Sequence, residues 1–451
     1  MSQQSRLNTT NMNSAEKELQ RQFYRAVTPQ SLSPGHKFYV PIYEQEGADE
    51  DPIALLQNQI EMCTDNTSAH LLSGYRGSGK STELQRLAQS LNSDGFLTVS
   101  TNIEKYVNTA VPIDISDMLL VLAGALGDGL QEQFGDGIAP SYWARFVDFL
   151  GRVRFQMDEV SVGFEAGYKD TSAAIRAGLQ VDPSFQTRLQ KHLSSHIGAL
   201  VDDIRNYIEN LTKGVLANSP SAQGIVFLVD SMEHFRDSSV TNNSVQSSVQ
   251  TVFTEHADRL RFPGIHAVYT ISPFVRVHAK ASLTDRYDGE TVMLRAVRVR
   301  ERSSKTPYGP GLKTLKEIIR RRGPIDQVIK HDDQLQDLLL LSGGHLGDLL
   351  RLIQAAITRA STFPINKETT DLAIKSIRKE LLPVAKEDAT WLHKIASTGY
   401  SSLQRMEDLN RLASFLDSHL LLAYQTDGEE WYHPHPLIAD EVSRLACEND
   451  S

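Results

Sequence analysis

Cysteine is scarce in this chain. Its 451 residues include two cysteines, Cys63 and Cys447, which lie far apart in the sequence. Their separation fits no metal-binding or redox motif, and so few cysteines exclude a disulfide-stapled scaffold. We therefore expect both to be free thiols in a reducing compartment.

Long hydrophobic runs are missing too. The longest apolar run, "MLLVLAGAL" at 118–126, is too short to cross a bilayer. The opening residues, "MSQQSRLNTTNMNS", contain neither an apolar core nor a basic cluster, so a signal peptide is not expected. These two features predict a soluble cytoplasmic protein with no membrane partner.

The chain also lacks an excess of positive charge. Its formal net charge is −10, which gives no overall attraction to nucleic acid or to an anionic membrane. A hydrophobic content of 40% and a charged content of 23% are typical of soluble globular proteins. Because 451 residues exceed one typical core, we expect two or three domains.

One motif carries clear chemistry. The letters "GYRGSGKS" at 74–81 fit G-x-x-x-x-G-K-[ST], between a predicted strand, "AHLLS", and an amphipathic helix. The glycines let the backbone turn and present N–H groups, while the helix dipole favours an anion. Lys80 is expected to reach the β- and γ-phosphates, and the Ser81 hydroxyl to ligate Mg²⁺. The predicted nucleotide-binding residues are Gly74, Tyr75, Arg76, Gly77, Ser78, Gly79, Lys80, Ser81 and Thr82.

A phosphate loop of this kind needs a second acidic group for the metal ion. The apolar run "IVFLVD" ends in Asp230, and Glu233 follows three residues later. We predict that Asp230 supports Mg²⁺ together with Ser81, and that Glu233 accepts a proton from the attacking water. The predicted catalytic residues are Lys80, Asp230 and Glu233. The alternatives are a turn residue for Asp230 and a solvated loop carboxylate for Glu233.

Further apolar runs of strand length predict the fold class. They are "FLTVST" (96–101), "GIVFLVDSMEHF" (224–235), "GIHAVYTISP" (264–273) and "TVMLRAVRV" (291–299). Runs that are apolar on both faces belong to a parallel sheet covered by helices, so the expected fold is α/β with a doubly wound core. A strand is also expected at "KFYVPIY" (37–43).

The remaining patterns predict the domain organisation. We expect a polar segment at 1–34 with a short helix capped by Ser14, a P-loop core at 35–305, a helical lid at 306–385 and a winged-helix-like domain at 386–451. The last of these ends in a β-hairpin with its turn at Asp427–Gly428.

The segment 115–215 is expected to be an insertion in the P-loop core. It starts with two helical patterns and ends in a long helix that begins at Pro183. Between them, alternating runs at 160–168 and 173–181 flank a polar "KDTS", which predicts a β-hairpin. We favour a structural decoration over a surface for partner docking.

Several P-loop classes can be set aside. "LSGGH" at 341–345 resembles the ABC signature, but it follows Asp230, and Ser231 stands where those enzymes have glutamate. The guanine motif N/T-K-x-D of GTPases is absent. A small-molecule kinase would rarely carry both a helical lid and a winged helix.

The motifs together resemble AAA+ and STAND ATPases, whose P-loop (ASCE) cores carry a helical lid and a winged helix, as in NACHT and origin-recognition proteins. The resemblance covers roughly 37–445 and rests on "GYRGSGKST", "FLVDSMEHF", "ISP", "SGGHLGDLLRL" and "HPL". The first and last of these are similar to bacterial STAND-like ATPases, among which antiviral defence is common. The resemblance implies an ATP- and Mg²⁺-dependent switch that controls homo-oligomer assembly or a protein effector.

The resemblance also implies roles for particular residues. Glu233 matches the second acidic position of the NACHT pattern, and Thr270 or Ser272 matches the polar sensor at a strand end. After the glycine pair, where AAA+ lids carry a sensor arginine, this chain has Leu346 and Gly347. Arg351, one turn later, is the candidate substitute.

Two other functions fit the same motifs. One is a DNA-associated AAA+ initiator or transposition-type loader, and the other is a nucleotide-binding scaffold without turnover. The helix at 406–420 and the wing tip at 427–430 are acidic, so binding to nucleic acid is not favoured. His433 and His435 are expected to pack or hydrogen-bond rather than bind metal. For the basic stretch at 295–322 we favour a solvated face, then an arginine finger, then a nucleic-acid patch.

Overall fold

The computed structural model describes residues 12–135, 141–155, 171–236, 244–401 and 407–448. The chain forms two compact units, which we call the sheet unit and the lid unit. The sheet unit consists of Pro52–Gly74 and Glu83–Leu294. The lid unit consists of Met1–Asp51, Tyr75–Thr82 and Arg295–Ser451, so the glycine loop belongs to it.

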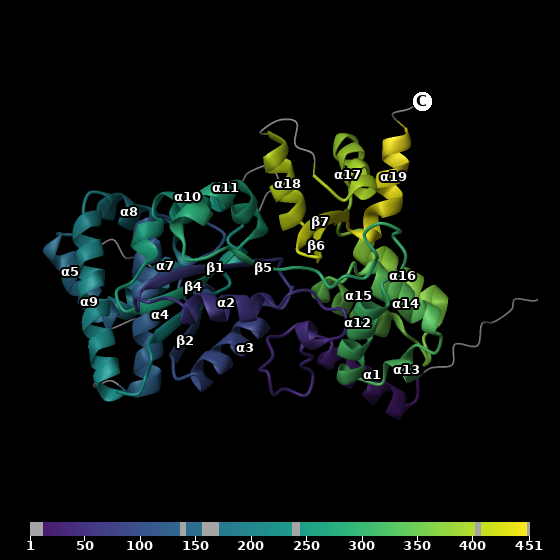
Figure 1. The fold of residues 1–451 in the computed structure, drawn as a ribbon, viewed down its shortest axis with the longest axis horizontal. Coiled ribbons are helices and arrows are strands. Elements are labelled where there is room, and N and C mark those ends of the chain that lie inside the picture. Colours follow the sequence, from purple (N-terminus) through teal and green to yellow (C-terminus); the bar gives the residue numbers. More distant parts are fainter. Residues whose placement is uncertain (1–11, 136–140, 156–170, 237–243, 402–406, 449–451) are drawn as a thin grey trace, which may run out of the picture. The chain divides into compact units, whose positions relative to one another are not determined.

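The sheet unit is built on a parallel five-stranded sheet in the order β2-β3-β4-β1-β5 (Figure 1). The strands are β1 (Ser68–Gly74), β2 (Leu97–Asn102), β3 (Ile225–Asp230), β4 (Ile265–Ile271) and β5 (Val292–Leu294). Every residue of β1 and β4 is buried, as apolar runs without alternation predict. The predicted doubly wound α/β core is confirmed, although β5 is shorter than the run at 291–299.

Helices flank this sheet. They are α2 (Pro52–Glu61), α3 (Lys80–Ser93), α10 (Ser244–Glu255) and α11 (Pro273–Arg286), with 3-10 turns at Ile103–Lys105, Met232–His234 and Ala257–Leu260. The first residues of α3 belong to the lid unit and the rest to the sheet unit. Helix α2 contacts β1 and β5, and α10 packs on α11. Both kinds of contact bury the apolar side of a helix, which is the usual reason for a layered α/β fold.

The predicted insertion is helical wherever it is described. Its helices are α4 (Ile115–Phe134), α5 (Tyr142–Arg152), α7 (Thr171–Val181), α8 (Pro183–Ser194) and α9 (Ile197–Asn218). Helix α4 contacts β2 and also packs on α5, α8 and α9. A Cβ atom at Gly124 of α4 would lie 2.2 Å from the Trp143 ring, so only glycine lets α5 approach this closely.

The β-hairpin predicted in this insertion is wrong in its second half. Residues 173–181 lie in α7, with Ala174, Ile175, Gly178 and Leu179 buried. Those positions also satisfy helical spacing, and the alanine-rich composition favours a helix over a strand. The first alternating run, 160–168, lies outside the described residues.

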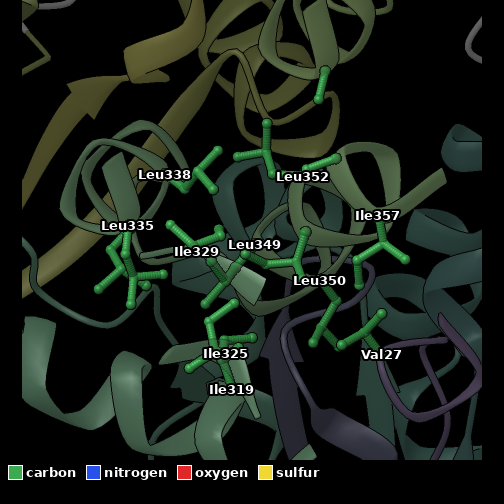
Figure 2. Close-up of a cluster of buried hydrophobic side chains, with 14 of the residues drawn as sticks. Val27, Ile319, Ile325, Ile329, Leu335, Leu338, Leu349, Leu350, Leu352 and Ile357 are labelled. Atoms are coloured by element: carbon green, nitrogen blue, oxygen red, sulfur yellow. The ribbon is translucent and has the colours of Figure 1, made fainter. Parts of the chain in front are cut away.

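The lid unit contains a helical core. Its helices are α1 (Ser14–Ala26), α12 (Gly309–Arg322), α13 (Ile325–Val328), α14 (Asp332–Leu341), α15 (Leu346–Arg359) and α16 (Lys367–Arg378). Figure 2 shows the apolar cluster that joins them, which includes Val27, Ile319, Ile325, Leu335, Leu349 and Leu352. Phe23 of α1 and Val27, the residue directly after this helix, are both part of the cluster. The N-terminal helix therefore belongs to the lid core.

Two local predictions in the lid unit are wrong. Helix α1 is capped by Asn13 and not by Ser14, because Asn13 and Glu16 form a reciprocal capping box. The expected strand at 37–43 is a turn followed by a 3-10 helix at Ile42–Glu44. Pro41 has no N–H group for a sheet, and Val40 is buried in the lid core instead.

The C-terminal part of the lid unit has the arrangement of a winged helix. Helices α17 (Lys386–Thr398) and α18 (Glu407–Asp417) precede the antiparallel strands β6 (Leu421–Thr426) and β7 (Glu429–Pro434), and α19 (Ala439–Cys447) follows a 3-10 turn at Pro436–Ile438. The predicted turn at Asp427–Gly428 is confirmed. Both residues have positive φ, of 52° and 80°, as a two-residue type I′ hairpin requires.

The basic stretch pairs with the acidic wing within the lid unit. Arg295 contacts Glu430 at 3.2 Å, and Arg302 contacts Glu429 at 2.7 Å. The Arg298 guanidinium lies 3.7 Å from the centre of the Tyr308 ring. Further along, Lys316 and Arg320 pair with Asp332 and Asp326. Much of this positive charge is therefore neutralised inside the unit.

Gly344 offers a test of the lid packing. Its φ is 76°, and a Cβ atom there would lie 1.7 Å from the Val297 carbonyl oxygen. We predict that Gly344→Ala lowers the free energy of unfolding by at least about 2 kcal/mol, through backbone strain and overpacking. Urea denaturation followed by tryptophan fluorescence measures this change, because Trp391 and Trp431 report on the lid unit.

Gly309→Ala is the matched control in the same unit. A Cβ atom at Gly309 meets nothing within 4 Å. That substitution should change the free energy of unfolding by less than about 1 kcal/mol, because Gly309 is exposed at the first position of α12. Equal effects of the two substitutions would contradict the packing described for Gly344.

Candidate functional site

Two residues of the glycine loop have a left-handed backbone conformation. Gly77 and Gly79 have φ of 81° and 98°, in the region that glycine adopts without strain. Helix α3 starts at Lys80, directly after the loop. The Lys80 side chain is buried, and its Nζ donates to the Tyr75 carbonyl oxygen at 2.6 Å. The Lys80 ammonium group is therefore bound by a backbone carbonyl of the same loop.

The start of lid helix α15 hydrogen-bonds to this loop. The Gly347 N–H donates to the Gly77 carbonyl at 3.0 Å, and His345 Nε2 donates to the Arg76 carbonyl at 2.9 Å. A Cβ atom on Gly347 would lie 3.3 Å from Gly77 Cα, which leaves little room for a side chain. Since the lid takes only carbonyl oxygens in these two bonds, it does not compete with a phosphate for the loop's N–H groups.

The winged-helix hairpin also reaches the loop. The Ala423 N–H of β6 donates to the Tyr75 hydroxyl at 2.7 Å. The Tyr75 ring is fully buried and meets the rings of His345 and His419 edge-on. Burial raises the pKa of Tyr75 well above its ordinary value, so the hydroxyl stays neutral. The loop, the lid helix and the hairpin are therefore bonded to one another within one unit.

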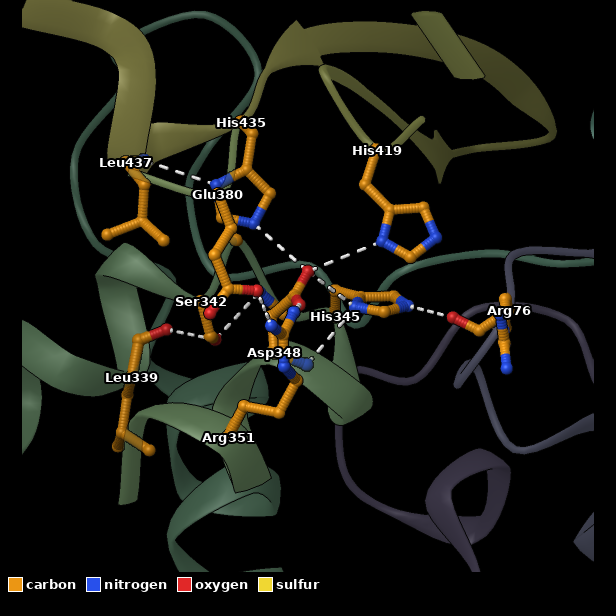
Figure 3. Close-up of polar contacts among 12 residues, drawn as sticks. Arg76, Leu339, Ser342, His345, Asp348, Arg351, Glu380, His419, His435 and Leu437 are labelled. Atoms are coloured by element: carbon orange, nitrogen blue, oxygen red, sulfur yellow. Dashed lines mark hydrogen bonds and ion pairs between the residues drawn. The ribbon is translucent and has the colours of Figure 1, made fainter. Parts of the chain in front are cut away.

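A buried carboxylate lies behind these contacts, as Figure 3 shows. Asp348 Oδ2 is 2.8 Å from His345 Nδ1, 3.3 Å from His435 Nε2 and 3.5 Å from His419 Nδ1. Its Oδ1 lies 3.2 Å from the Arg351 guanidinium. We call these five residues the Asp348 cluster. It connects α15 to the residues just before β6 and just after β7, at the open end of the wing hairpin.

The Asp348 carboxylate is ionised despite its burial. Burial alone would raise its pKa, but the charge of His345 and the hydrogen bonds from the three histidines hold the pKa well below its usual range. Burial, followed by repulsion from His345, lowers the pKa of His419 to about 4. Burial likewise lowers the pKa of His435.

The hydrogen-bond partners fix the proton of one of these rings. His435 Nδ1 accepts from the Leu437 N–H at 3.2 Å, so its proton is on Nε2 and faces Asp348. His345 Nε2 faces the Arg76 carbonyl, and its Nδ1 lies close to both the carboxylate and the backbone N–H of Asp348. Although His345, Asp348 and His419 are close enough to surround a metal ion, Arg351 already supplies a cation to the same carboxylate.

The predicted acidic residues lie in the sheet unit. Asp230 ends β3, and its Oδ1 accepts from the Ser231 N–H at 2.7 Å. Because β4 lies between β3 and β1, Asp230 stands two strands, or roughly 10 Å, from the end of the strand that leads into the loop. Glu233 lies in the 3-10 helix Met232–His234, and its side chain is 7% exposed.

Both candidate sensor residues hold the backbone in the sheet unit. Thr270 Oγ1 accepts from the Met232 N–H at 3.0 Å and so shapes the turn between Asp230 and Glu233. Ser272 caps α11 by accepting from the Val275 N–H. Each hydroxyl therefore has a structural role, in addition to the role of polar sensor that the resemblance implies.

Other predicted residues also have structural partners in the lid unit. Thr82 Oγ1 accepts from the Leu32 N–H at 3.1 Å, and Arg351 pairs with Asp348 and Glu380. His433 Nδ1 donates to the Pro434 carbonyl, in line with the hydrogen-bonding role expected for this histidine. Sequence reasoning missed Asp348, although a histidine three residues before an aspartate at a helix start was a local signal.

Comparisons with protein-family models and with curated proteins find no match. Among solved structures, the chain is similar to a Walker-type ATPase of Pyrococcus abyssi, with 13% identity, coverage of 90% of this chain and 100% of that chain, and a TM-score of 0.43. It is also similar to the ADP form of the ORC2 protein of Aeropyrum pernix, with 11% identity, coverage of 94% and 98%, and a TM-score of 0.41. A third similar structure is Cdc6p of Pyrobaculum aerophilum, with 11% identity, coverage of 93% and 99%, and a TM-score of 0.32.

TM-scores below 0.5 transfer no ligand, partner or activity to this chain. Its own sheet order and glycine loop define the class: an α/β P-loop core followed by a helical lid and a winged-helix-like domain. Within the described residues, no helix is both long and apolar enough to cross a membrane.

Removal of the Asp348 charge tests the cluster. We predict that Asp348→Asn lowers the free energy of unfolding by about 3–5 kcal/mol, because Arg351 and the three imidazoles lose the buried carboxylate that they contact. Glu380→Gln is the control, since Glu380 is an exposed partner of the same Arg351, and it should cost less than about 1 kcal/mol. Equal costs in urea denaturation would show that the buried carboxylate does not stabilise the lid unit.

Proposed function

We propose that this protein is an Mg²⁺-dependent ATPase of STAND/AAA+ type that works as a molecular switch. Its nucleotide state controls homo-oligomer assembly or a protein effector. The observation that carries the proposal is the set of hydrogen bonds from the phosphate loop to the lid helix and the wing hairpin: Gly347 to Gly77, His345 to Arg76 and Ala423 to Tyr75. A ligand that changes the conformation of the loop would change these hydrogen bonds. Binding could thereby shift the lid helix and the wing hairpin between two conformations.

The loop residues fit a nucleotide phosphate chain. Two glycines with positive φ, a helix N-terminus at Lys80 and a buried ammonium group are the features that bind such an anion. Lys80 would exchange the Tyr75 carbonyl for a charged phosphate oxygen, which is the stronger acceptor. Ser81 and Asp230 are the residues that would hold Mg²⁺. The ion, when bound, neutralises phosphate charge.

Tyr75 is the point at which binding would be transmitted. Its carbonyl accepts from Lys80, and its hydroxyl accepts from Ala423 of β6. When Lys80 turns to a phosphate, the Tyr75 carbonyl loses the bond from Lys80 and keeps only the one from the Ser78 N–H. The wing strand is bonded to the same residue and so responds to the change.

An antiviral-defence pathway is part of this proposal. It rests on the similarity of "GYRGSGKSTEL" and "HPL" to bacterial STAND-like ATPases. The identity of the neighbouring genes tests it, because a defence role requires an effector or sensor gene beside this one.

Replacement of Lys80 tests nucleotide binding. Mg-ATP at 100 times its Kd should stabilise the wild-type protein by about 2.7 kcal/mol, and Lys80→Ala should abolish most of that gain while the protein remains folded. Lys213→Ala, which removes an exposed ammonium group, should behave like the wild type. Thermal unfolding with and without Mg-ATP measures the gain. An undiminished gain in Lys80→Ala would refute the loop assignment.

Replacement of the acidic residues separates binding from turnover. Glu233→Gln should leave the Mg-ATP melting shift intact and slow phosphate release by roughly 100-fold or more, the usual contribution of a positioned base. Asp230→Asn should weaken turnover and its Mg²⁺ dependence together. If the wild type binds ATP but shows no turnover above a Lys80→Ala blank, the nucleotide-binding scaffold becomes the correct function.

The winged-helix arrangement supports a second candidate, a DNA-associated initiator or transposition-type loader. The ion pairs oppose it, because Arg295 and Arg302 are engaged by the wing carboxylates Glu430 and Glu429 and cannot also neutralise phosphates. We predict that the full chain shows no sub-micromolar binding to a labelled duplex at physiological salt. The variant Glu429→Gln/Glu430→Gln, which releases both arginines, should bind more tightly.

Fluorescence anisotropy titrated across salt measures both affinities. Tight binding by the wild type, with a slope of about −0.9 per phosphate contacted, would make the DNA-associated function the better one.

A further inference from the structure

A second polar cluster lies in the sheet unit, at the amino ends of β1 and β4. Ser68 and His70 are two residues apart on β1 and so point to the same face of the sheet. His266 of β4 is the register partner of Ser68. Cys63, which follows α2, brings a thiol to the same place. We call these four residues the Cys63 cluster.

The side chains of this cluster converge on one point. The Ser68 hydroxyl lies 2.8 Å from His70 Nε2 and 2.7 Å from His266 Nδ1. Cys63 Sγ is 4.0 Å from the same His70 nitrogen. The ligand atoms of Cys63, His70 and His266 all lie within 4.8 Å of one another. Around a tetrahedral zinc ion such atoms are about 3.4 to 3.6 Å apart, given bond lengths of about 2.1 Å to nitrogen and 2.3 Å to sulfur.

Three side chains of this cluster are almost completely buried. Ser68, His70 and His266 are 0%, 1% and 2% exposed. Buried polar groups are costly unless they are fully paired. One ring nitrogen, His70 Nδ1, is buried with no hydrogen-bond partner among the described residues. A cation at His70 Nε2 would fix the ring proton on Nδ1, the nitrogen that a metal-ligating histidine leaves to an outer partner.

The cluster is separate from the nucleotide site. Ser68 begins β1, whereas the phosphate loop follows Gly74 at the other end of that strand. Six residue steps of an extended strand span roughly 20 Å. Nothing in the proposed ATPase mechanism uses Cys63, His70 or His266, so the cluster requires a role of its own.

We propose that the Cys63 cluster binds a borderline-soft divalent cation, with zinc as the preferred ion. The ligands are the Cys63 thiolate, His70 Nε2 and His266 Nδ1, and the fourth position is filled by the Ser68 hydroxyl or a water molecule. One thiolate and two imidazoles form a donor set that favours zinc over magnesium or calcium. Cys63 is only partly buried, which leaves a path for the ion.

Metal binding changes the protonation of one group. The Cys63 thiol, which donates to the Gln59 carbonyl at 3.2 Å, loses its proton to solvent and forms a bond from sulfur to the metal. No electrons are transferred, so no oxidant or reductant is needed. The bound ion would link the residues after α2 to the first residues of β1 and β4. It would thereby stabilise the sheet at the N-terminal ends of these two strands.

The test uses the full chain after treatment with a chelator. Zn²⁺ is titrated in competition with a chromophoric chelator, and Co²⁺ is then used as a spectroscopic probe of thiolate coordination. We expect one Zn²⁺ per chain and a thiolate-to-cobalt absorption band. Cys63→Ser should abolish the band and weaken Zn²⁺ binding at least about 100-fold, because loss of an outer-shell partner alone costs about 10- to 100-fold. Cys447→Ser, at the other cysteine, should change neither.

A second readout needs no variant. Zn²⁺ should slow alkylation of Cys63 in the wild-type chain and leave alkylation of Cys447 unchanged, as followed by mass spectrometry. The proposal is overturned if the wild type gives no thiolate-to-cobalt band, or if Cys63→Ser retains full affinity through other histidines. Zn²⁺ binding should be the same in Lys80→Ala, so failure of the nucleotide site and failure of this site are distinguishable.

Discussion

The lid unit depends on one buried charge, the carboxylate of Asp348. It lies among three histidines and an arginine that come from α15, from the chain before β6 and from the chain after β7. A buried carboxylate without partners is strongly destabilising. Separation of these segments would leave Asp348 unpaired, so the carboxylate holds them together. His345 completes the arrangement, since the ring that pairs with Asp348 also hydrogen-bonds to the phosphate loop through Arg76.

This arrangement places a loop of a few residues in direct contact with two larger elements. The loop is bonded to the lid through Gly77 and Arg76, and to the wing through Tyr75. The lid and the wing in turn share the Asp348 cluster, so neither can move far without breaking a bond to the other or to the loop. The pairs of Arg295 and Arg302 with the wing carboxylates add a further connection between the basic stretch and the wing.

Local signals in the sequence predicted the features that depend on neighbouring residues. The P-loop, the parallel strands and the Asp427–Gly428 turn follow from short patterns with a definite backbone conformation. The segment 173–181 was misassigned because its alternation also satisfies helical spacing. The Asp348 cluster was not predictable in the same way, since His419 and His435 meet Asp348 only through tertiary folding. Likewise, nothing in the sequence alone brings Cys63 beside His266.

The most direct test of the account is amide hydrogen exchange on the full chain with and without Mg-ATP. The central claim is that the loop, the lid helix and the wing strand respond as one bonded group. The account predicts that Mg-ATP changes exchange at the loop, at the Gly347 amide and at the Ala423 amide together, because the last two donate to loop atoms. Protection of the loop amides alone, with exchange at Gly347 and Ala423 unchanged, would contradict it.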